Sequence, residues 1–181
     1  LVNNNGNYNL SMGIGSLYSN TTGNSNMGVG QSSLYSNITG NNNVGIGQAT
    51  LASNVDGNYN TAIGFASLNN IKGSRNVGIG YKAGISKDVS DKLFIQNDED
   101  NLLIYGDFEN KQVGINKDSI TTGYNLEVSG NTKIRGDLNL YTNDDLSNIS
   151  IGDNILQSST TGIYNIGIGA NNLYSNSTGQ H

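Results

Sequence analysis

Acidic side chains are the residues of this chain that could most directly support chemistry. Residues 98–100 read Asp-Glu-Asp, and Asp88, Asp91 and Asp107 lie close to them in the sequence. Carboxylate oxygens bind Ca²⁺, but this run lacks the alternating Asp/Asn spacing and the distal Glu of a calcium loop. A solvated hairpin tip is the favoured interpretation, and we expect no metal site.

Paired carboxylates could also hydrolyse glycosides. Glu109, Glu127 and Asp137 are the candidates, but nothing in the sequence fixes their separation or places an aromatic platform beside them. The one histidine is His181, which leaves no histidine-based triad within this sequence. Gly-x-Gly recurs, but polar turn residues follow it in place of the helix that a phosphate loop needs. We predict no enzyme activity and no cofactor.

Tyrosines are the candidates for recognition. They fall in two columns of a repeat, Tyr18, Tyr35 and Tyr174 in one and Tyr8, Tyr59 and Tyr164 in the other. Aromatic rings beside amides and hydroxyls suit glycan binding, so Tyr18, Tyr35 and Tyr174 are candidate glycan contacts. The favoured interpretation is that stacked tyrosines and asparagines simply stabilise neighbouring coils. An ice-binding face would need a regular threonine array, which Asp56 and Lys72 interrupt.

The repeat itself is the element that must position these residues. Its phrase is Gly, turn residues, Asn, and then apolar-small-apolar-Gly. Copies begin with an even spacing at Gly6, Gly23, Gly40 and Gly57, then at Gly73 after a spacing that is one residue shorter, and again at Gly162. The columns of the repeat are counted from this first Gly. A short fixed period of this kind predicts a solenoid in which stacked coils share one core.

Each column of the repeat has a chemical character. Column four is Asn, columns five and seven are apolar except for Thr61, column six is small, and column eight is Gly. Alternation of apolar with small residues predicts a strand whose small side lies against other backbone. The closing Gly indicates a positive φ or a close approach. Column twelve, Leu in five copies, is expected to begin a second, weaker strand.

The assembly follows from the small interior of such a coil. Burying three apolar side chains per repeat stabilises a coil by less than the free energy that ordering the backbone of the whole repeat costs. We therefore expect a parallel homotrimer, intertwined or side by side, with columns five and seven facing a common axis. The fold class predicted is an all-β, elongated parallel β-solenoid or β-roll of 17-residue repeats with a small all-β insert.

Composition narrows the choice of partners. The chain has no Pro and no Cys, 34% hydrophobic and 13% charged residues, and a net charge of −5. Scattered basic residues and an acidic balance disfavour nucleic acid and anionic membranes as partners. Neither a signal peptide nor an apolar run of transmembrane length is recognisable. We expect an internal segment of a longer extracellular protein.

Residues 85–161 depart from the repeat. Residues 92–95 and 102–105 predict a hairpin around a polar turn, and further strands are expected at 112–115, 125–128, 132–135 and 137–140. The expected division is therefore a repeat solenoid over 1–84, an all-β insert or knob over 85–161, and a resumed solenoid over 162–181.

Two phrases resemble known families. Residues 76–84, Asn-Val-Gly-Ile-Gly-Tyr-Lys-Ala-Gly, resemble the head repeats of trimeric autotransporter adhesins. Residues 102–108, 113–116 and 126–138 are similar to phage and giant-virus tail-fibre proteins, many of which end in an endosialidase-type intramolecular chaperone. The resemblance implies a trimeric rod with a left-handed β-roll that displays binding surfaces at a distance from a virion or cell. Adhesin heads usually have a shorter repeat than the one in this chain.

The expected function is accordingly a structural fibre or spike segment of a virus or phage that carries attachment sites on the virion surface. The alternative is a bacterial trimeric adhesin head on the cell surface. A polysaccharide-degrading tailspike and an ice-binding rod are less favoured. The expected partners are two further copies of the chain and a cell-surface glycan or receptor.

Overall fold

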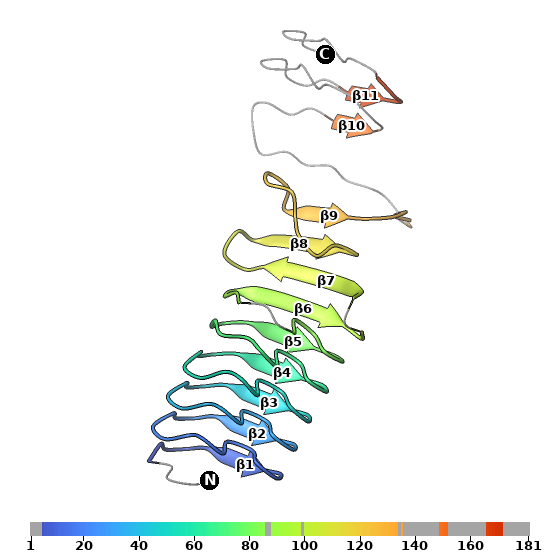
Figure 1. Ribbon diagram of the computed structural model, residues 1–181. Helices are drawn as coiled ribbons and strands as arrows, with labels where there is room; N and C mark the ends of the chain where they lie inside the picture. Colours follow the sequence, from blue (N-terminus) through green and yellow to red (C-terminus); the bar gives the residue numbers. More distant parts are fainter. Residues whose placement is uncertain are drawn as a thin grey trace. The chain divides into compact units, whose positions relative to one another are not determined.

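The computed structural model describes residues 5–85, 88–98, 100–133, 135, 149–151 and 166–171. In these ranges the chain is all-β and contains no helix, as the sequence predicts. The chain divides into two compact units, residues 1–132 and 133–181, which are described separately (Figure 1).

The first unit is built on one sheet of nine strands, in which the spatial order follows the order along the chain. The strands are β1 (Leu10–Met12), β2 (Met27–Val29), β3 (Val44–Ile46), β4 (Thr61–Ile63), β5 (Val77–Ile79), β6 (Lys92–Gln96), β7 (Leu102–Asp107), β8 (Gln112–Ile115) and β9 (Leu126–Val128).

Strands β1 to β6 are parallel, and each belongs to one turn of the solenoid. Leu10 pairs with Met27 and Met27 pairs with Val44, so each residue lies beside its counterpart in the next copy of the repeat. Thr61 pairs with Val77, which keeps the columns aligned across the shorter spacing. Equivalent columns therefore lie directly above one another. The result is a β-solenoid of about seven turns, which confirms the predicted fold class at this level.

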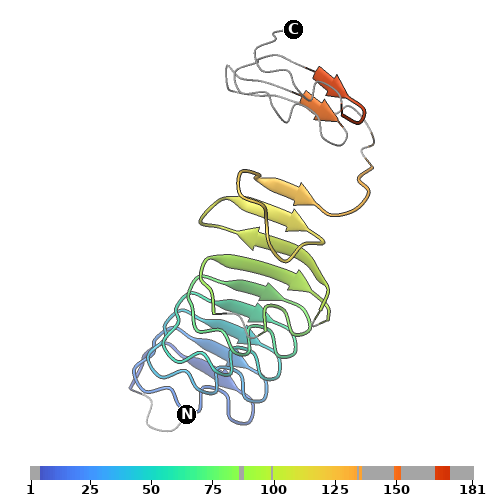
Figure 2. The ribbon, with the colours of Figure 1, turned by 45° about the horizontal axis from the view of Figure 1, so that its top comes forward.

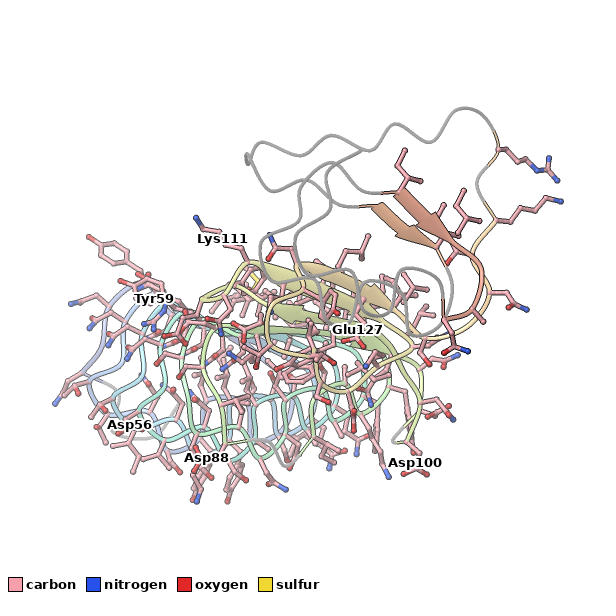
Figure 3. All side chains as sticks on the ribbon, turned by 90° about the horizontal axis from the view of Figure 1, so that it is seen from above. Asp56, Tyr59, Asp88, Asp100, Lys111 and Glu127 are labelled. Carbon is pink, nitrogen blue, oxygen red and sulfur yellow. The ribbon has the colours of Figure 1, made fainter. Side chains whose placement is uncertain are left out.

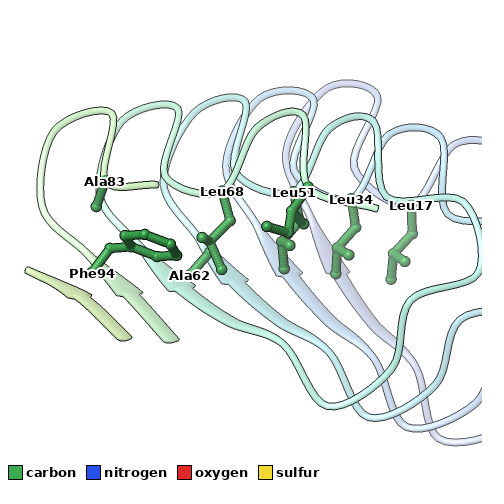
Figure 4. Packing of buried hydrophobic residues seen from close by; sticks show 8 residues of the cluster. Leu17, Leu34, Leu51, Ala62, Leu68, Ala83 and Phe94 are labelled. Carbon is green, nitrogen blue, oxygen red and sulfur yellow. The ribbon is translucent and has the colours of Figure 1, made fainter. Parts of the chain in front are cut away.

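The core lies between the sheet and the return segment of each coil. Four column-twelve leucines stack there, each fully buried, and the ladder ends at Phe94 (Figure 4). Column six is small because its side chains point into this space. A Cβ added at Gly45 would lie 2.6 Å from Ser33 Oγ. The stacked leucines are Leu17, Leu34, Leu51 and Leu68.

The predicted second strand of each coil is wrong. The return segments are turns, and the four column-twelve leucines have φ between 47° and 52°. Left-handed residues curl a chain that a strand would extend. The segments are nevertheless tied from coil to coil, for example by Leu34 N–H donating to Thr50 O at 2.8 Å. Figure 2 shows these return segments stacked in step with the strands.

The column-eight glycines of the first unit confirm both expectations, a positive φ and a close approach, whereas Gly169 of the second unit has the positive φ alone. Gly47 has a φ of 129°, outside the range open to other residues. A Cβ there would also lie 2.6 Å from the carbonyl oxygen of Gly64 in the next coil. Gly64 repeats both features against Gly80.

The sheet continues without a break into the non-repeat segment. Strand β6 pairs parallel to β5, then β6, β7 and β8 pair antiparallel, and β9 returns to a parallel pairing on β8. The predicted hairpin is confirmed, with an irregularity at Ile95/Gln96. The division at residue 84 stays a prediction. The predicted strand at 132–135 is absent at its described residues 132, 133 and 135. Residue 134 and the predicted strand at 137–140 lie outside the described residues.

The second unit contains a two-stranded parallel sheet. Strand β10 (Ile149–Ile151) pairs with β11 (Ile166–Ile168), and Ile149 faces Ile166 at the same sequence offset as Leu10 and Met27 in the first unit. Strand β11 occupies columns five to seven of the predicted sixth copy. The rest of the predicted solenoid at 162–181 lies outside the described residues, apart from 169–171.

Candidate functional site

The column-four asparagines hold the coils together by bonding to backbone groups. Asn43 Oδ1 accepts the N–H of Asn60 at 2.9 Å, and Asn43 Nδ2 donates to Gly57 O at 2.8 Å. Asn26 and Asn60 make the equivalent bonds one coil away. Because these side chains are buried, they satisfy backbone groups that water cannot reach.

Two further amide ladders run along the stack, in columns that were not named from the sequence, although stacked asparagines were expected to stabilise neighbouring coils. In the buried ladder, Asn37 Nδ2 donates to Asn20 Oδ1 at 2.7 Å and Asn54 repeats the bond to Asn37 at 3.0 Å. In the part-buried ladder, Asn24 and Asn41 donate in the same way to the next coil. The recurring Ser-Asn phrase was the available signal. Much of the Asn content is thus structural.

The predicted tyrosine column forms a stack. The rings of Tyr18 and Tyr35 are parallel to within 4°, with centroids 5.2 Å apart. Both side chains are partly exposed, but each ring covers one face of the other. Tyr174 lies outside the described residues. The packing is the one expected if tyrosines stabilise neighbouring coils, and the glycan contact stays a prediction.

A second aromatic stack lies in column nine, which the sequence analysis did not single out. The Phe65 and Tyr81 rings are stacked with centroids 5.4 Å apart, and Lys82 Nζ lies 5.5 Å from the Tyr81 centroid. Gly15 lies close to the first stack, since a Cβ added at Gly15 would lie 3.3 Å from the Tyr35 ring. Aromatic packing along the surface is therefore a recurrent way of joining coils.

Most acidic residues near the hairpin are engaged in local structure. Asp98 caps its turn by accepting from Asn101 Nδ2 at 2.9 Å and from two backbone N–H groups. The side-chain bond from Asn101 is the main reason that the pKa of Asp98 lies below its usual value. Glu99 lies outside the described residues. The arrangement is that of a capped hairpin tip, and within the described residues no three acidic or metal-binding side chains gather as a metal site would need.

Two further carboxylates near the hairpin form ion pairs. Asp91 binds Arg75, which lowers the pKa of the carboxyl group. Lys92 Nζ lies 3.1 Å from Asp107 Oδ1. Burial would raise the pKa of Asp107, but bonds from Asn110 and Lys92 outweigh it and the pKa is lowered.

The proposed glycosidase carboxylates have different surroundings. Glu127 binds Lys117 and accepts from Thr121 N–H at 2.9 Å, so its pKa is lowered, mainly by the bond from Lys117. A general acid for glycoside cleavage needs a raised pKa. Glu109 is exposed in the β7–β8 turn. Asp137 lies outside the described residues.

A hollow of about 760 Å³ lies beside the ends of β6 and β8. Ile79 and Ile95 line it, together with Asn97 and residues 100–102. Asn116, which has a φ of 53°, and Lys117 also line it. The hollow combines apolar and polar lining without an aromatic platform for a sugar ring.

The outward face of the sheet is left without a partner in the described structure. Residues paired across strands point to the same side, so the sheet presents two rows of side chains away from the core. Row five consists of Leu10, Met27, Val44, Thr61, Val77, Leu93, Gly106, Val113 and Leu126, and row seven of Met12, Val29, Ile46, Ile63, Ile79, Ile95, Ile104, Ile115 and Val128.

These two rows are apolar and accessible to solvent. Ile46 is 38% exposed, Met12 61% and Leu126 64%. Thr61 is the one polar residue among the members of the rows, and none is charged. Columns five and seven therefore point away from the core of their own coil, as a contact between chains would require. No residue that the structure describes covers this face.

Comparisons with protein-family models, with curated proteins and with solved structures give no match to this chain. Within the described residues, no helix has the length and apolar character needed to cross a lipid bilayer.

Proposed function

We propose that this chain is a segment of a homotrimeric attachment fibre or spike of the phage or viral tail-fibre type. Its place is extracellular, on the surface of a virion, and it performs no catalysis. A bacterial trimeric surface adhesin is the second candidate. Both candidates rest on the resemblance of residues 76–84, 102–108, 113–116 and 126–138 to those families and on the architecture of the coils.

The observation that carries the proposal is the set of side-chain ladders along the stack. Each coil satisfies the polar groups of the next, as when Asn43 bonds both Asn60 N–H and Gly57 O. A coil built this way adds length with little change of cross-section, which suits a structure that spans distance. The described carboxylates with perturbed pKa values are all shifted downward, which favours structural roles over acid catalysis.

Attachment through this segment would rest on neutral polar groups and aromatic edges. The exposed parts of Tyr18 and Tyr35 are the candidate contacts, together with Tyr174. Single contacts of this kind bind at about millimolar affinity, and three copies could raise the avidity by about 10²–10⁴. Because no basic patch takes part, glycan binding should change little with salt.

A glycan array probed at low and high ionic strength tests attachment directly. Salt-independent binding that is lost in the Tyr18→Ala/Tyr35→Ala variant supports a direct contact. Matched Tyr124→Ala, which alters an exposed tyrosine outside the stack, should bind as the parent does. Silence across the array, with binding by another part of the full-length protein, would make this segment a shaft.

Sequence beyond both ends of this segment would distinguish a location on a virion from a location on a bacterial cell. A membrane-anchor domain downstream favours the bacterial adhesin, and an intramolecular chaperone or a tail-attachment segment favours the virion.

A further inference from the structure

We propose that the outward face of the nine-stranded sheet is one continuous contact surface between copies of this chain, extending from β1 through β9. The inference rests on the proposed homotrimer and adds to it the non-repeat strands. Rows five and seven pass from the parallel coils into β6, β7, β8 and β9 without changing side.

The continuity depends on pairings that the sequence does not reveal. Ile79 pairs with Ile95 across parallel strands, and Ile95 pairs with Ile104 across the hairpin. Ile104 pairs with Ile115, which pairs with Val128. Although β7 runs in the opposite direction, its register keeps an isoleucine in row seven. The apolar surface therefore continues beyond the strands of the 17-residue repeat.

One position of row five is filled indirectly. Gly106 has no side chain, but a Cβ there would lie 2.9 Å from Leu93 Cβ. Leu93 thus lies against the position that Gly106 leaves open. The row remains apolar across β6 and β7.

Charge favours a second copy as the occupant. The chain carries a net charge of −5, so copies repel one another at most surfaces. Neither row contains a charged residue at any of its described positions. Copies can therefore meet at this face without bringing like charges together.

The spacing of side chains along each row also favours a second copy as the occupant. Side chains in each row repeat at the separation of neighbouring strands, about 4.8 Å. A second copy of the same sheet presents the same spacing, so the side chains of the two faces can interlock along their whole length. Sheets packed in this way lie about 10 Å apart.

The area of the two rows indicates which flanking side chains must join the contact. Nine strands by two rows make a strip about 40 Å long and about 10 Å wide, or about 400 Å². Each partner in a standard interface contributes about 800 Å². The remainder must come from the flanking columns, where Tyr8 and Tyr59 precede row five and Phe65 and Tyr81 follow row seven, all exposed.

Disulfide trapping tests the surface, because the chain has no cysteine of its own. Single variants Ile46→Cys in β3 and Ile115→Cys in β8 probe the two halves of row seven. Asp56→Cys is the matched control, because Asp56 is exposed on the side of the coils away from the sheet (Figure 3). The molar mass of each reduced variant is measured first by light scattering.

The expected result is a trimeric mass for all three variants, with rapid disulfide-linked dimers on mild oxidation at positions 46 and 115 and none at 56. A trimer that links at 46 but not at 115 would overturn the extension into β6–β9. A trimer that links only at 56 would overturn the face and leave the fibre proposal standing. A folded monomer, or a monomer that instead floats with neutral lipid vesicles, would overturn the assembly itself.

Discussion

Replacing Gly47 by alanine should weaken the solenoid more than its single methyl group suggests. Gly47 closes β3 with a φ of 129°, and its added Cβ would lie 2.6 Å from Gly64 O and 2.8 Å from Gly64 C. The atoms it meets belong to the backbone of the next coil. A rigid neighbour of this kind cannot swing aside as a flexible side chain would.

The magnitude follows from two separable costs. Holding a non-glycine residue at this φ costs about 1–3 kcal/mol. Moving the Gly64 peptide by several tenths of an ångström strains the bond from Gly64 N–H to Ile46 O, now 2.9 Å long, at about 0.5–1.5 kcal/mol. We expect Gly47→Ala to lower the free energy of unfolding by about 2–4 kcal/mol per chain.

Two control variants separate the costs. Gly123 has a φ of 98° with no atom within 4 Å of its added Cβ, so Gly123→Ala carries the conformational cost alone. Gly45 has no left-handed φ and meets Ser33 Oγ at 2.6 Å, and its equivalent in the next coil is Ala62. Gly45→Ala should therefore cost less than Gly47→Ala.

Urea unfolding followed by far-ultraviolet circular dichroism measures all three variants. The expected order of destabilisation places Gly47→Ala first, above both controls. If Gly47→Ala unfolds at the same urea concentration as the parent, the assignment of column eight as a site of strain and close approach is wrong.

The remaining predictions concern the asparagine ladder and acid. Asn43→Ala should cost about 1–3 kcal/mol per chain in urea unfolding, because it leaves the buried Asn60 N–H unpaired, whereas Gly57 O keeps its bond from Asn54 Nδ2; an unchanged midpoint would contradict it. Acid should loosen β6–β9 before the coils, because the lowered pKa values of Asp107 and other carboxylates all belong to residues 91–127. Their stabilisation is complete above the unfolded pKa of about 4 and is lost as pH falls through the lower folded values. Amide NMR spectra between neutral pH and about pH 2 check the order, and simultaneous loss of both regions would refute it.

The strand pattern was predictable because each column has one physical task. Apolar-small-apolar-Gly specifies a strand with one inward side, and the structure places β1 to β5 and β11 at columns five to seven. The closing glycines were predictable because few other residues tolerate their φ. The hairpin at β6 and β7 was predictable from two apolar runs around a polar turn.

The return segment was not predictable from the same reasoning. Leu51 has a φ of 50° inside the core, although leucine normally avoids this region. Burial of its side chain and the backbone bond to Ser67 O at 3.1 Å offset the local strain. Local preference alone therefore indicated an extended strand where tertiary packing imposes a turn.

One strand, β10, was missed for a simpler reason. Residues 148–152 read Asn-Ile-Ser-Ile-Gly, which matches columns four to eight, but no Gly opens that copy. The structure pairs β10 with β11 in the same register as the other coils. The continuity of the outward rows through β6–β9 also escaped prediction, because it depends on which strands pair.

The most direct test of assembly through the outward face is the molar mass of the folded chain in solution. Multi-angle light scattering should give three times 19.1 kDa across a range of concentrations. A well-folded species of 19.1 kDa, with its apolar rows open to water, would contradict the account.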